Sequence, residues 1–481
     1  MGGTVRFLLD GEVQELSDID PTLTVLHLLR YHLRRTGTKE SCAEGDCGAC
    51  TVVLGELEGG RVRFRAVNAC ILFAPMLDGR ALYTVESLKR DGELHPVQRA
   101  MVESHGSQCG FCTPGFVMSL YAHQREGAAT DTQTLKDALA GNLCRCTGYG
   151  PIVAAGQAMG PDALSGEAEA LAVALKGIQR KEPLVLLHKD RRFIAPRTTA
   201  ELATAVAQYP DATILAGGTD VGLWVTKQHR KLPTVISLNE VEELRRIEDL
   251  GDAIRIGAAV RHVDAHRILG ELHADFGELL RRFGGLPIRN MGTVCGNIAN
   301  GSPIGDMPPA LIAAGAMVSV RRGAISLHYA LEDYFIAYGQ QLRGAGEFVD
   351  AVIIPKIPAN RIFRIFKLSK RFDQDISAVC AGISVGVEAG VVTDARIAFG
   401  GMAATPKRAR ALEAALKGCP WTEAGASSAL DALETDFQPI NDMRATAGYR
   451  LQAAKNLILR AVLETDQAAP RVLELSAVRH G

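Results

Sequence analysis

The sequence predicts a multidomain α+β protein with a cysteine-rich front and a longer, cysteine-poor back. Three observations support this prediction. The chain has 481 residues, which is too long for one hydrophobic core. Eight of its eleven cysteines lie between Cys42 and Cys146. Beyond Phe193, strand-like and helix-like segments alternate along the chain.

The overall composition excludes several classes of partner. Lys plus Arg is 53 and Asp plus Glu is 54, so the formal charge of −1 offers no positive excess for nucleic acid. The apolar run at 310–320 is shorter than the roughly 18 residues of a membrane span, and no apolar signal core opens the chain. We therefore expect a cytoplasmic protein with reduced cysteines that binds neither nucleic acid nor membrane.

The front of the chain predicts two hairpins around a helix. Residues 4–16 alternate between apolar and polar and turn at an Asp-Gly pair, which is a strong hairpin signal. Residues 23–37 show helical periodicity up to a glycine, which predicts a helix that ends there. Residues 51–70 predict a second hairpin.

Four cysteines around this second hairpin predict a metal centre. Cys42, Cys47, Cys50 and Cys70 are spaced C-x4-C-x2-C-x19-C, as in [2Fe–2S] clusters of the plant ferredoxin type. The small residues between them let backbone N–H groups approach the sulfurs. A structural zinc ion also accepts four thiolates. Three ligands from one loop favour the cluster over zinc.

Four further cysteines predict a second centre. Cys109, Cys112, Cys144 and Cys146 are spaced C-x2-C-x31-C-x1-C. Residues 113–124 predict a helix, so the first pair would lie at a helix N-terminus, where the dipole favours thiolate. A second predicted helix delivers the other pair. A C-x-C pair is unusual for zinc, so we expect a binuclear cluster between helices.

Two glycine-containing segments in the back half are candidate phosphate sites. Residues 212–225 form an apolar run broken by two glycines, and residues 296–315 predict a Gly/Asn/Ser loop that leads into a helix. Such loops let backbone amides approach a pyrophosphate, although ordinary turns have the same composition. Neither segment is G-x-G-x-x-G, so a Rossmann dinucleotide site is not predicted.

The motifs QCGFCTPG and NLCRCTGY behind a ferredoxin-like module resemble the iron–sulfur portion of the molybdenum hydroxylases, the xanthine dehydrogenase family. The resemblance includes all eight cysteines of the front. It implies a β-grasp, plant-ferredoxin-like [2Fe–2S] domain at 1–82 and a helical-bundle [2Fe–2S] domain at 83–158. It also implies that Gln108 faces a molybdopterin cofactor held by a catalytic domain.

The back of the chain resembles the flavoprotein part of the same family. The resemblance implies a linker at 159–185, an FAD-binding α+β domain at 186–360 and a small C-terminal α+β domain at 361–481. One departure is Cys295, where the family commonly has glycine. The FAD contacts implied by position are Ile214, Leu215, Ala216, Gly217, Gly218, Thr219, Asp220, Val221, Phe283, Thr293, Val294, Cys295, Gly296, Asn297, Asp306, Val349 and Lys367.

The resemblance also implies a function. Electrons would pass from a molybdopterin cofactor through two [2Fe–2S] clusters to FAD and then to NAD⁺, during oxidation of hypoxanthine and xanthine to urate in purine catabolism. A molybdopterin domain needs several hundred more residues, so we expect no catalytic residue on this chain. We expect a molybdenum-binding large catalytic subunit as partner, in a heterotetramer or larger complex.

Three alternatives stay open at the level of sequence. The chain could serve another molybdenum hydroxylase that oxidises an aldehyde or an N-heterocycle, because a partner would choose the substrate. It could be a stand-alone ferredoxin–flavin shuttle, or a zinc-stabilised scaffold. The mixed-charge segment 367–377 is either solvated surface or, as the resemblance implies, a loop beside the flavin.

Overall fold

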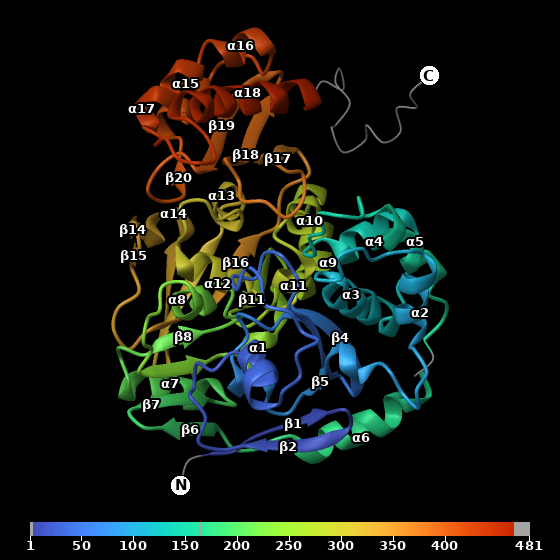
Figure 1. The fold of residues 1–481 in the computed structure, drawn as a ribbon. Coiled ribbons are helices and arrows are strands. Elements are labelled where there is room, and N and C mark those ends of the chain that lie inside the picture. Colours follow the sequence, from blue (N-terminus) through green and yellow to red (C-terminus); the bar gives the residue numbers. More distant parts are fainter. Residues whose placement is uncertain (1–2, 163–164, 466–481) are drawn as a thin grey trace.

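The computed structural model describes residues 3–162 and 165–465 and confirms the predicted multidomain α+β fold. In Figure 1 the blue and cyan front of the chain lies against a green and yellow centre, and the orange and red end lies above that centre. The domain boundaries given above stay predictions, and the C-terminal domain beyond residue 465 lies outside the described residues. We name four units: N-terminal (3–87), helical (96–158), central (184–355) and C-terminal (361–465).

The N-terminal unit is built on a five-stranded sheet. Its strands are β1 (Val5–Leu9), β2 (Glu12–Leu16), β3 (Thr51–Glu58), β4 (Arg61–Asn68) and β5 (Ala81–Tyr83). The strand order is β2-β1-β5-β3-β4, with β1 parallel to β5 and the other pairs antiparallel. This is the β-grasp order. The hairpins predicted at 4–16 and 51–70 are both confirmed.

The helix predicted over 23–37 is wrong in its second half. The structure has a short α-turn followed by a π-helical turn, α1 (Val25–His27) and η1 (Leu28–His32). The chain then reverses at Arg34, which has a left-handed φ of 57°. The Arg30 guanidinium donates to the Thr38 carbonyl at 2.9 Å and holds the reversed segment. A reversal held by a side chain from eight positions away has no signal in helical periodicity.

The helical unit consists of four helices, of which three pack around the fourth, the buried helix α3. They are α2 (Pro96–Glu103), α3 (Thr113–Arg125), α4 (Thr132–Leu139) and α5 (Gly150–Ala158). Helix α3 is buried at each position from Gly115 to Gln124, because the other helices and strands β3 and β4 surround it. The helix predicted at 113–124 is therefore confirmed.

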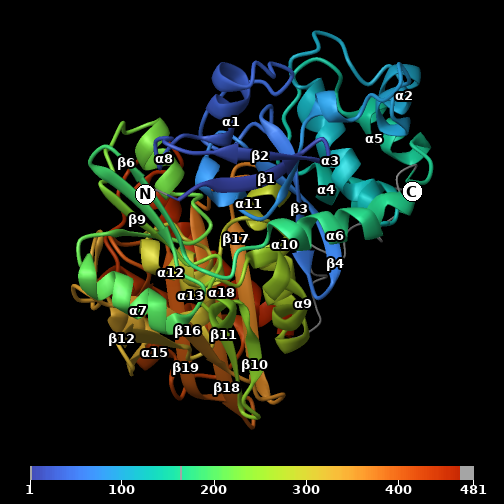
Figure 2. The same cartoon turned by 90° about the horizontal axis from the view of Figure 1, so that it is seen from below.

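The predicted linker at 159–185 contains a packed helix. Helix α6 (Ala168–Ile178) buries Leu175 and Ile178 against Leu8 of the N-terminal sheet. Figure 2 shows α6 running along this sheet, toward strands β3 and β4. The connection is thus fixed to the first unit over much of its length.

The central unit contains two sheets. The small sheet, of order β6-β7-β9-β8, has strands β6 (Leu184–His188), β7 (Arg191–Ala195), β8 (Thr213–Leu215) and β9 (Thr234–Ser237). The large sheet, of order β10-β11-β16-β12-β13, has strands β10 (Ile247–Asp249), β11 (Ala253–Gly257), β12 (Met317–Arg322), β13 (Ile325–Ala330) and β16 (Phe348–Pro355). A separate hairpin pairs β14 (Phe335–Ala337) with β15 (Gln340–Gln341).

Eight short helices surround these sheets. They are α7 (Thr199–Gln208), α8 (Val221–Thr226), α9 (His262–Leu272), α10 (Ala274–Arg281), α11 (Leu286–Arg289), α12 (Val294–Asn300), α13 (Met307–Ala313) and α14 (Leu331–Tyr334). The loop predicted to begin at residue 296 is wrong, because α12 occupies that position. The Thr293 hydroxyl accepts from the Gly296 N–H at 3.0 Å and caps this helix.

The C-terminal unit is an antiparallel sheet covered by helices. Its strands, in the order β17-β18-β19-β20, are β17 (Arg361–Leu368), β18 (Val379–Glu388), β19 (Val391–Gly400) and β20 (Lys407–Arg408). Its helices are α15 (Arg410–Leu416), α16 (Glu423–Ser427), α17 (Leu433–Asp436) and α18 (Ala447–Thr465). Short 3₁₀ turns complete the chain at η2 (Ala74–Leu77), η3 (Val85–Ser87), η4 (Ser165–Glu167), η5 (Glu242–Arg245) and η6 (Leu430–Ala432). No helix among the described residues has the length and hydropathy to cross a membrane.

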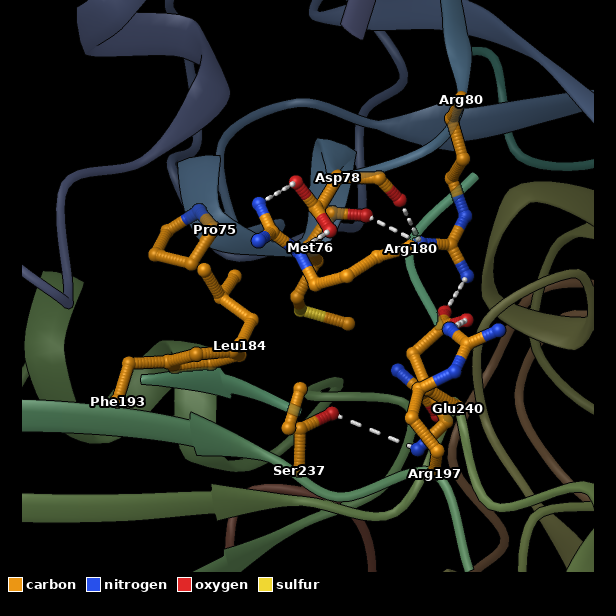
Figure 3. A pocket seen from close by; sticks show the side chains of 12 residues that line it. Pro75, Met76, Asp78, Arg80, Arg180, Leu184, Phe193, Arg197, Ser237 and Glu240 are labelled. Carbon is orange, nitrogen blue, oxygen red and sulfur yellow. Dashed lines mark hydrogen bonds and ion pairs between the residues drawn. The ribbon is translucent and has the colours of Figure 1, made fainter. Parts of the chain in front are cut away.

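Buried charges join the N-terminal unit to the central unit. The Glu56 carboxylate accepts from Arg80 at 2.6 Å and from Arg261 at 2.5 and 2.8 Å, and Arg65 Nε lies 3.3 Å away. Arg80 also reaches Glu240 at 2.7 Å, as Figure 3 shows. Burial acts to raise the pKa of Glu56, but the guanidinium groups outweigh it and hold this pKa well below its usual range.

We predict that Glu56→Ala destabilises the fold strongly. The change leaves buried guanidinium groups without their shared carboxylate, so the free energy of unfolding should fall by about 3–5 kcal/mol at pH 7. Urea unfolding of the full chain measures this. The exposed Glu242, paired with Arg246 at 3.1 Å, is the matched control; Glu242→Ala should cost less than about 1 kcal/mol. Equal losses of unfolding free energy in the two variants would contradict the role of Glu56 as the buried acceptor shared by the arginines.

The same carboxylate predicts a pH dependence. Because the folded pKa of Glu56 is depressed, its contribution is complete above the ordinary glutamate pKa of 4.5 and is lost as pH falls through the folded value. The stability difference between wild type and Glu56→Gln should therefore shrink only below pH 4.5. A difference that shrinks between pH 8 and 6 would show that another group is responsible.

Candidate functional site

The structure gathers the first four predicted thiols into one cluster. The Cys42 thiol lies within hydrogen-bonding distance of the thiols of Cys47 and Cys70, and Cys70 also reaches Cys50. The Cys47 backbone N–H donates to Cys42 Sγ at 3.4 Å, and Asn68 Nδ2 lies 4.0 Å from Cys50 Sγ. Hydrogen bonds from Cys47 and Cys70 lower the pKa of Cys42, whereas the same contacts raise the pKa values of Cys47 and Cys70, so of these three thiols Cys42 carries the negative charge most readily.

The second four thiols also come together, nearer to the surface. Cys112 pairs with Cys144, and Cys109 pairs with Cys146. Burial, together with the bond to Cys144, raises the pKa of Cys112 to about 12, and Cys112 forms the N-cap of α3. Cys109 and Cys146 are exposed, whereas Cys50 and Cys70 of the first set are buried. The two sets therefore differ in their access to other molecules.

The eight cysteines stay predicted ligands. Among the described residues, no group of three or more His, Cys, Asp or Glu side chains is arranged to hold a single metal ion. Each set brings four sulfurs from two separate segments to one place, which is the ligand chemistry of a [2Fe–2S] cluster.

A cavity of about 1010 Å³ lies between the central unit, the first-cluster loop and the C-terminal unit. Such a volume is at the upper end of the roughly 300–1,000 Å³ of small-molecule pockets, as a dinucleotide requires. Two of the predicted FAD residues, Leu215 and Val294, do not line this cavity, because their side chains pack into the hydrophobic cores. The predicted FAD residues that line the cavity are Ile214, Ala216, Gly217, Gly218, Thr219, Asp220, Val221, Phe283, Thr293, Cys295, Gly296, Asn297, Asp306, Val349 and Lys367.

The backbone of the 214–221 segment fits the approach of a phosphate. A Cβ on Gly217 would lie 2.1 Å from the Met291 carbonyl, and Gly218 has a left-handed φ of 75°. The turn thus presents backbone rather than side chains. The Asn297 Oδ1 atom, in the same wall, is buried and has no hydrogen-bond partner among the described residues. These features suit the pyrophosphate of FAD.

A buried ion pair forms another part of the cavity wall. Lys367 Nζ lies 2.5 Å from Asp306 Oδ2, and both side chains are almost fully buried. The Ser377 hydroxyl donates to the other Asp306 oxygen at 2.5 Å. Both predicted residues, Asp306 and Lys367, are therefore held in fixed positions, although they are 61 positions apart in the chain.

Sequence reasoning missed several residues of this cavity. His262 stacks on Phe283 with ring centroids 4.1 Å apart, and burial lowers the pKa of His262 to about 3, so the imidazole is neutral. No motif marks this histidine. Further missed residues come from other units, where only tertiary contact could reveal them: Glu44, Gly45, Asp46, Met443 and Arg444. The segment 367–377, for which the resemblance implies a loop beside the flavin, also lines the cavity, through Lys367, Arg371, Gln374, Asp375 and Ile376.

Four family models match the chain in order. Residues 7–74 match a 2Fe-2S iron-sulfur cluster binding domain, and residues 84–157 match a [2Fe-2S] binding domain. Residues 189–357 match the FAD binding domain in molybdopterin dehydrogenase, and residues 364–465 match the CO dehydrogenase flavoprotein C-terminal domain. The chain thus contains two [2Fe–2S]-binding domains and an FAD-binding domain.

This chain is similar to several curated proteins and solved structures. A xanthine dehydrogenase from Drosophila subobscura is 33% identical over 83% of this chain, and one from Emericella nidulans is 29% identical over 90% of it. The chain spans only about a third of these relatives, 34% and 36%. A carbon monoxide dehydrogenase chain from Hydrogenophaga pseudoflava has a TM-score of 0.53 at 26% identity, over 56% of this chain and 95% of that one.

We predict that Gly217→Ala weakens FAD binding and leaves iron in place. The new methyl group would displace the Met291 backbone, at a cost of about 1–3 kcal/mol, or roughly 5- to 150-fold in FAD affinity. Fluorescence titration of FAD and iron analysis measure the two effects. Gly177→Ala is the matched control, because its Cβ meets no atom within 4 Å. Normal FAD affinity in Gly217→Ala would contradict a role of the Gly217–Gly218 turn in binding the pyrophosphate.

Serine substitutions should remove the two clusters separately. We expect Cys50→Ser to abolish one EPR signal and Cys109→Ser the other, with about half of the iron lost in each, because each set supplies its own four thiolates. FAD absorbance should stay normal. Cys419→Ser, outside both sets, serves as the control. Full iron content in either variant would refute that ligand set.

Proposed function

This chain belongs to the molybdenum hydroxylase family as its iron–sulfur and FAD-binding portion, and from this premise we propose that it passes electrons from a molybdenum cofactor on a partner subunit to NAD⁺. The proposed path runs through two [2Fe–2S] clusters and FAD. We propose oxidation of hypoxanthine and xanthine to urate as the reaction, with this chain as the small subunit of a xanthine dehydrogenase. The similarity to two curated xanthine dehydrogenases supports this choice.

One observation carries the electron-transfer proposal. The loop that contains Cys42 and Cys47 also forms part of the wall of the large cavity, through Glu44, Gly45 and Asp46. A cluster held by this loop would lie beside a flavin in the cavity. The second thiol set has exposed members and faces outward. The proposed order is therefore partner, second cluster, first cluster and flavin.

The residues of the chain have distinct tasks in this proposal. When bound, the clusters supply one-electron transfer, and the flavin exchanges electrons singly or in pairs. The eight thiolates hold the clusters. The Gly217–Gly218 turn offers backbone N–H groups to the pyrophosphate, and the Asp306–Lys367 pair fixes a charged contact in the wall. The neutral His262–Phe283 stack provides an apolar surface that excludes water.

A separate molybdenum subunit is part of the proposal. The carbon monoxide dehydrogenase chain, almost wholly covered by 56% of this sequence, supports a division of the cofactors among subunits. The exposed surface around the second set, with Phe111 and Tyr149, would adjoin that partner. We propose a cytoplasmic heterotetramer or larger complex, with substrate oxidation wholly on the partner subunit.

A second candidate is the same electron path in a hydroxylase for another substrate. The solved carbon monoxide dehydrogenase chain, which matches 56% of this chain, belongs to an enzyme named for a substrate other than a purine, and this similarity supports the second candidate. An aldehyde or an N-heterocycle would then be the electron source, because the substrate pocket would lie on the partner.

We predict that the native complex converts hypoxanthine and NAD⁺ to urate and NADH. The test is purification of the chain with its natural partner, analysis of molybdenum, iron and FAD, and measurement of NADH formation at 340 nm on a panel of purines, aldehydes and N-heterocycles. Turnover of an aldehyde or N-heterocycle alone would select the second candidate. Recovery of the chain without partner or molybdenum would contradict both and favour a stand-alone shuttle.

A further inference from the structure

Three consecutive carbonyls of the first-cluster loop each accept a hydrogen bond from another part of the chain. Two donors belong to the helical unit, and the third belongs to the loop that follows β17. The bonds are Leu143 N–H to Cys47 at 3.0 Å, Asn142 Nδ2 to Gly48 at 3.1 Å, and Gln374 Nε2 to Asp46. The loop next to the predicted ligand Cys47 is therefore held from two sides.

Gln374 joins all three parts with one side-chain amide. Its NH₂ group donates to Asp46, and its Oε1 accepts from the Gly141 N–H at 3.1 Å. These contacts connect it to residues 328 and 233 positions away. Gln374 also lines the flavin cavity. A single amide thus connects the cavity wall to both cluster-bearing units.

The backbone at this position is strained. Gln374 has a left-handed φ of 51°, which costs a residue with a side chain about 1–2 kcal/mol. Strain of this kind persists where surrounding contacts over-determine the conformation, and it concentrates at functional sites. Here the strained conformation directs the amide toward Asp46 and Gly141. A glycine would adopt the same φ without strain but would lack the amide.

Hydrogen bonds within the loop and from its neighbours fix the position of Gln374. The Arg371 guanidinium donates to the Gln374 carbonyl at 2.7 Å, and the Arg282 side chain donates to the Phe372 carbonyl at 3.0 Å. Asp306 anchors both ends of the loop, through Lys367 and Ser377. These contacts hold the loop in place in the cavity wall, and the Gln374 side chain attaches it to the first-cluster loop.

We propose that Gln374 is a positioning residue that fixes the first-cluster loop against the flavin cavity and so sets the rate of electron passage between them. The inference rests on the proposed function. In the step concerned, one electron leaves the first cluster, which is oxidised, and enters the flavin, which is reduced; no other reactant takes part. The geometry of donor and acceptor governs such a step, so we expect the step to slow when the loop after β17 no longer holds the first-cluster loop.

Two variants separate the amide from the backbone. Gln374→Gly relieves the strained φ and removes both hydrogen bonds. Gln374→Glu keeps an acceptor for the Gly141 N–H but removes the donor to Asp46. The matched controls are Ala389→Gly, at an exposed hairpin turn with φ 49°, and Gln452→Glu, on the exposed side of α18.

The experiment uses the full complex with its cofactors. A light flash excites deazaflavin, which reduces the complex. Time-resolved absorbance then follows the redistribution of electrons between the clusters and the flavin. We expect both Gln374 variants to equilibrate about tenfold more slowly than wild type and to show an altered EPR spectrum of the first cluster. Iron content, FAD content and the second cluster's spectrum should stay unchanged, and both controls should behave as wild type.

Two results would overturn the inference alone. Wild-type rates and spectra in Gln374→Gly would show that the amide positions nothing. Loss of iron or FAD from Gln374→Glu would show that the residue holds a cofactor domain together instead. A wild-type complex that lacks cluster-to-flavin transfer would overturn the proposed function itself, and this inference with it.

Discussion

Three units of this chain meet backbone against backbone at Gly48, Gly141 and Gly285. A Cβ on Gly48 would lie 2.1 Å from the Gly141 carbonyl, and a Cβ on Gly285 would lie 2.5 Å from the Gly141 Cα. Any side chain at these points would force the units apart, because no real Cβ tolerates such distances. Two cluster loops and the flavin cavity can be neighbours only because these three residues have no side chains.

Charges orient the same units at a second interface. The Glu56 carboxylate, shared by guanidinium groups from both units, is almost fully buried, so the loss of one partner would leave buried charge without its counter-ion. An apolar interface tolerates small rotations, whereas a carboxylate bound by several arginines has few acceptable geometries. The glycine contacts set the distance between units, and the ion pairs set their angle.

The two thiol sets differ in burial, and this difference supports the positions proposed for them on the electron path. Cys50 and Cys70 lie inside the protein, and the loop before Cys50 contributes Glu44, Gly45 and Asp46 to the wall of the large cavity, whereas Cys109 and Cys146 lie at the surface. On the proposed path, an electron from the partner subunit reaches the exposed set first. The first-cluster loop forms part of the wall of the flavin cavity, so the proposed direction of electron transfer rests on the packing of the domains.

Local patterns in the sequence determined much of this protein. The hairpins around the Asp-Gly turn and the cysteine loop, the helix after Cys112 and the glycine turn at Gly217 each depend on residues close together in the chain. Tertiary structure decided the rest. The helix predicted to residue 37 stops at His32 because the Arg30 side chain holds a reversal, and Gln374 reaches Asp46 across 328 positions. Helical periodicity does not report a reversal that a side chain holds from eight positions away, and the Gln374 contact forms only after separate domains have packed together.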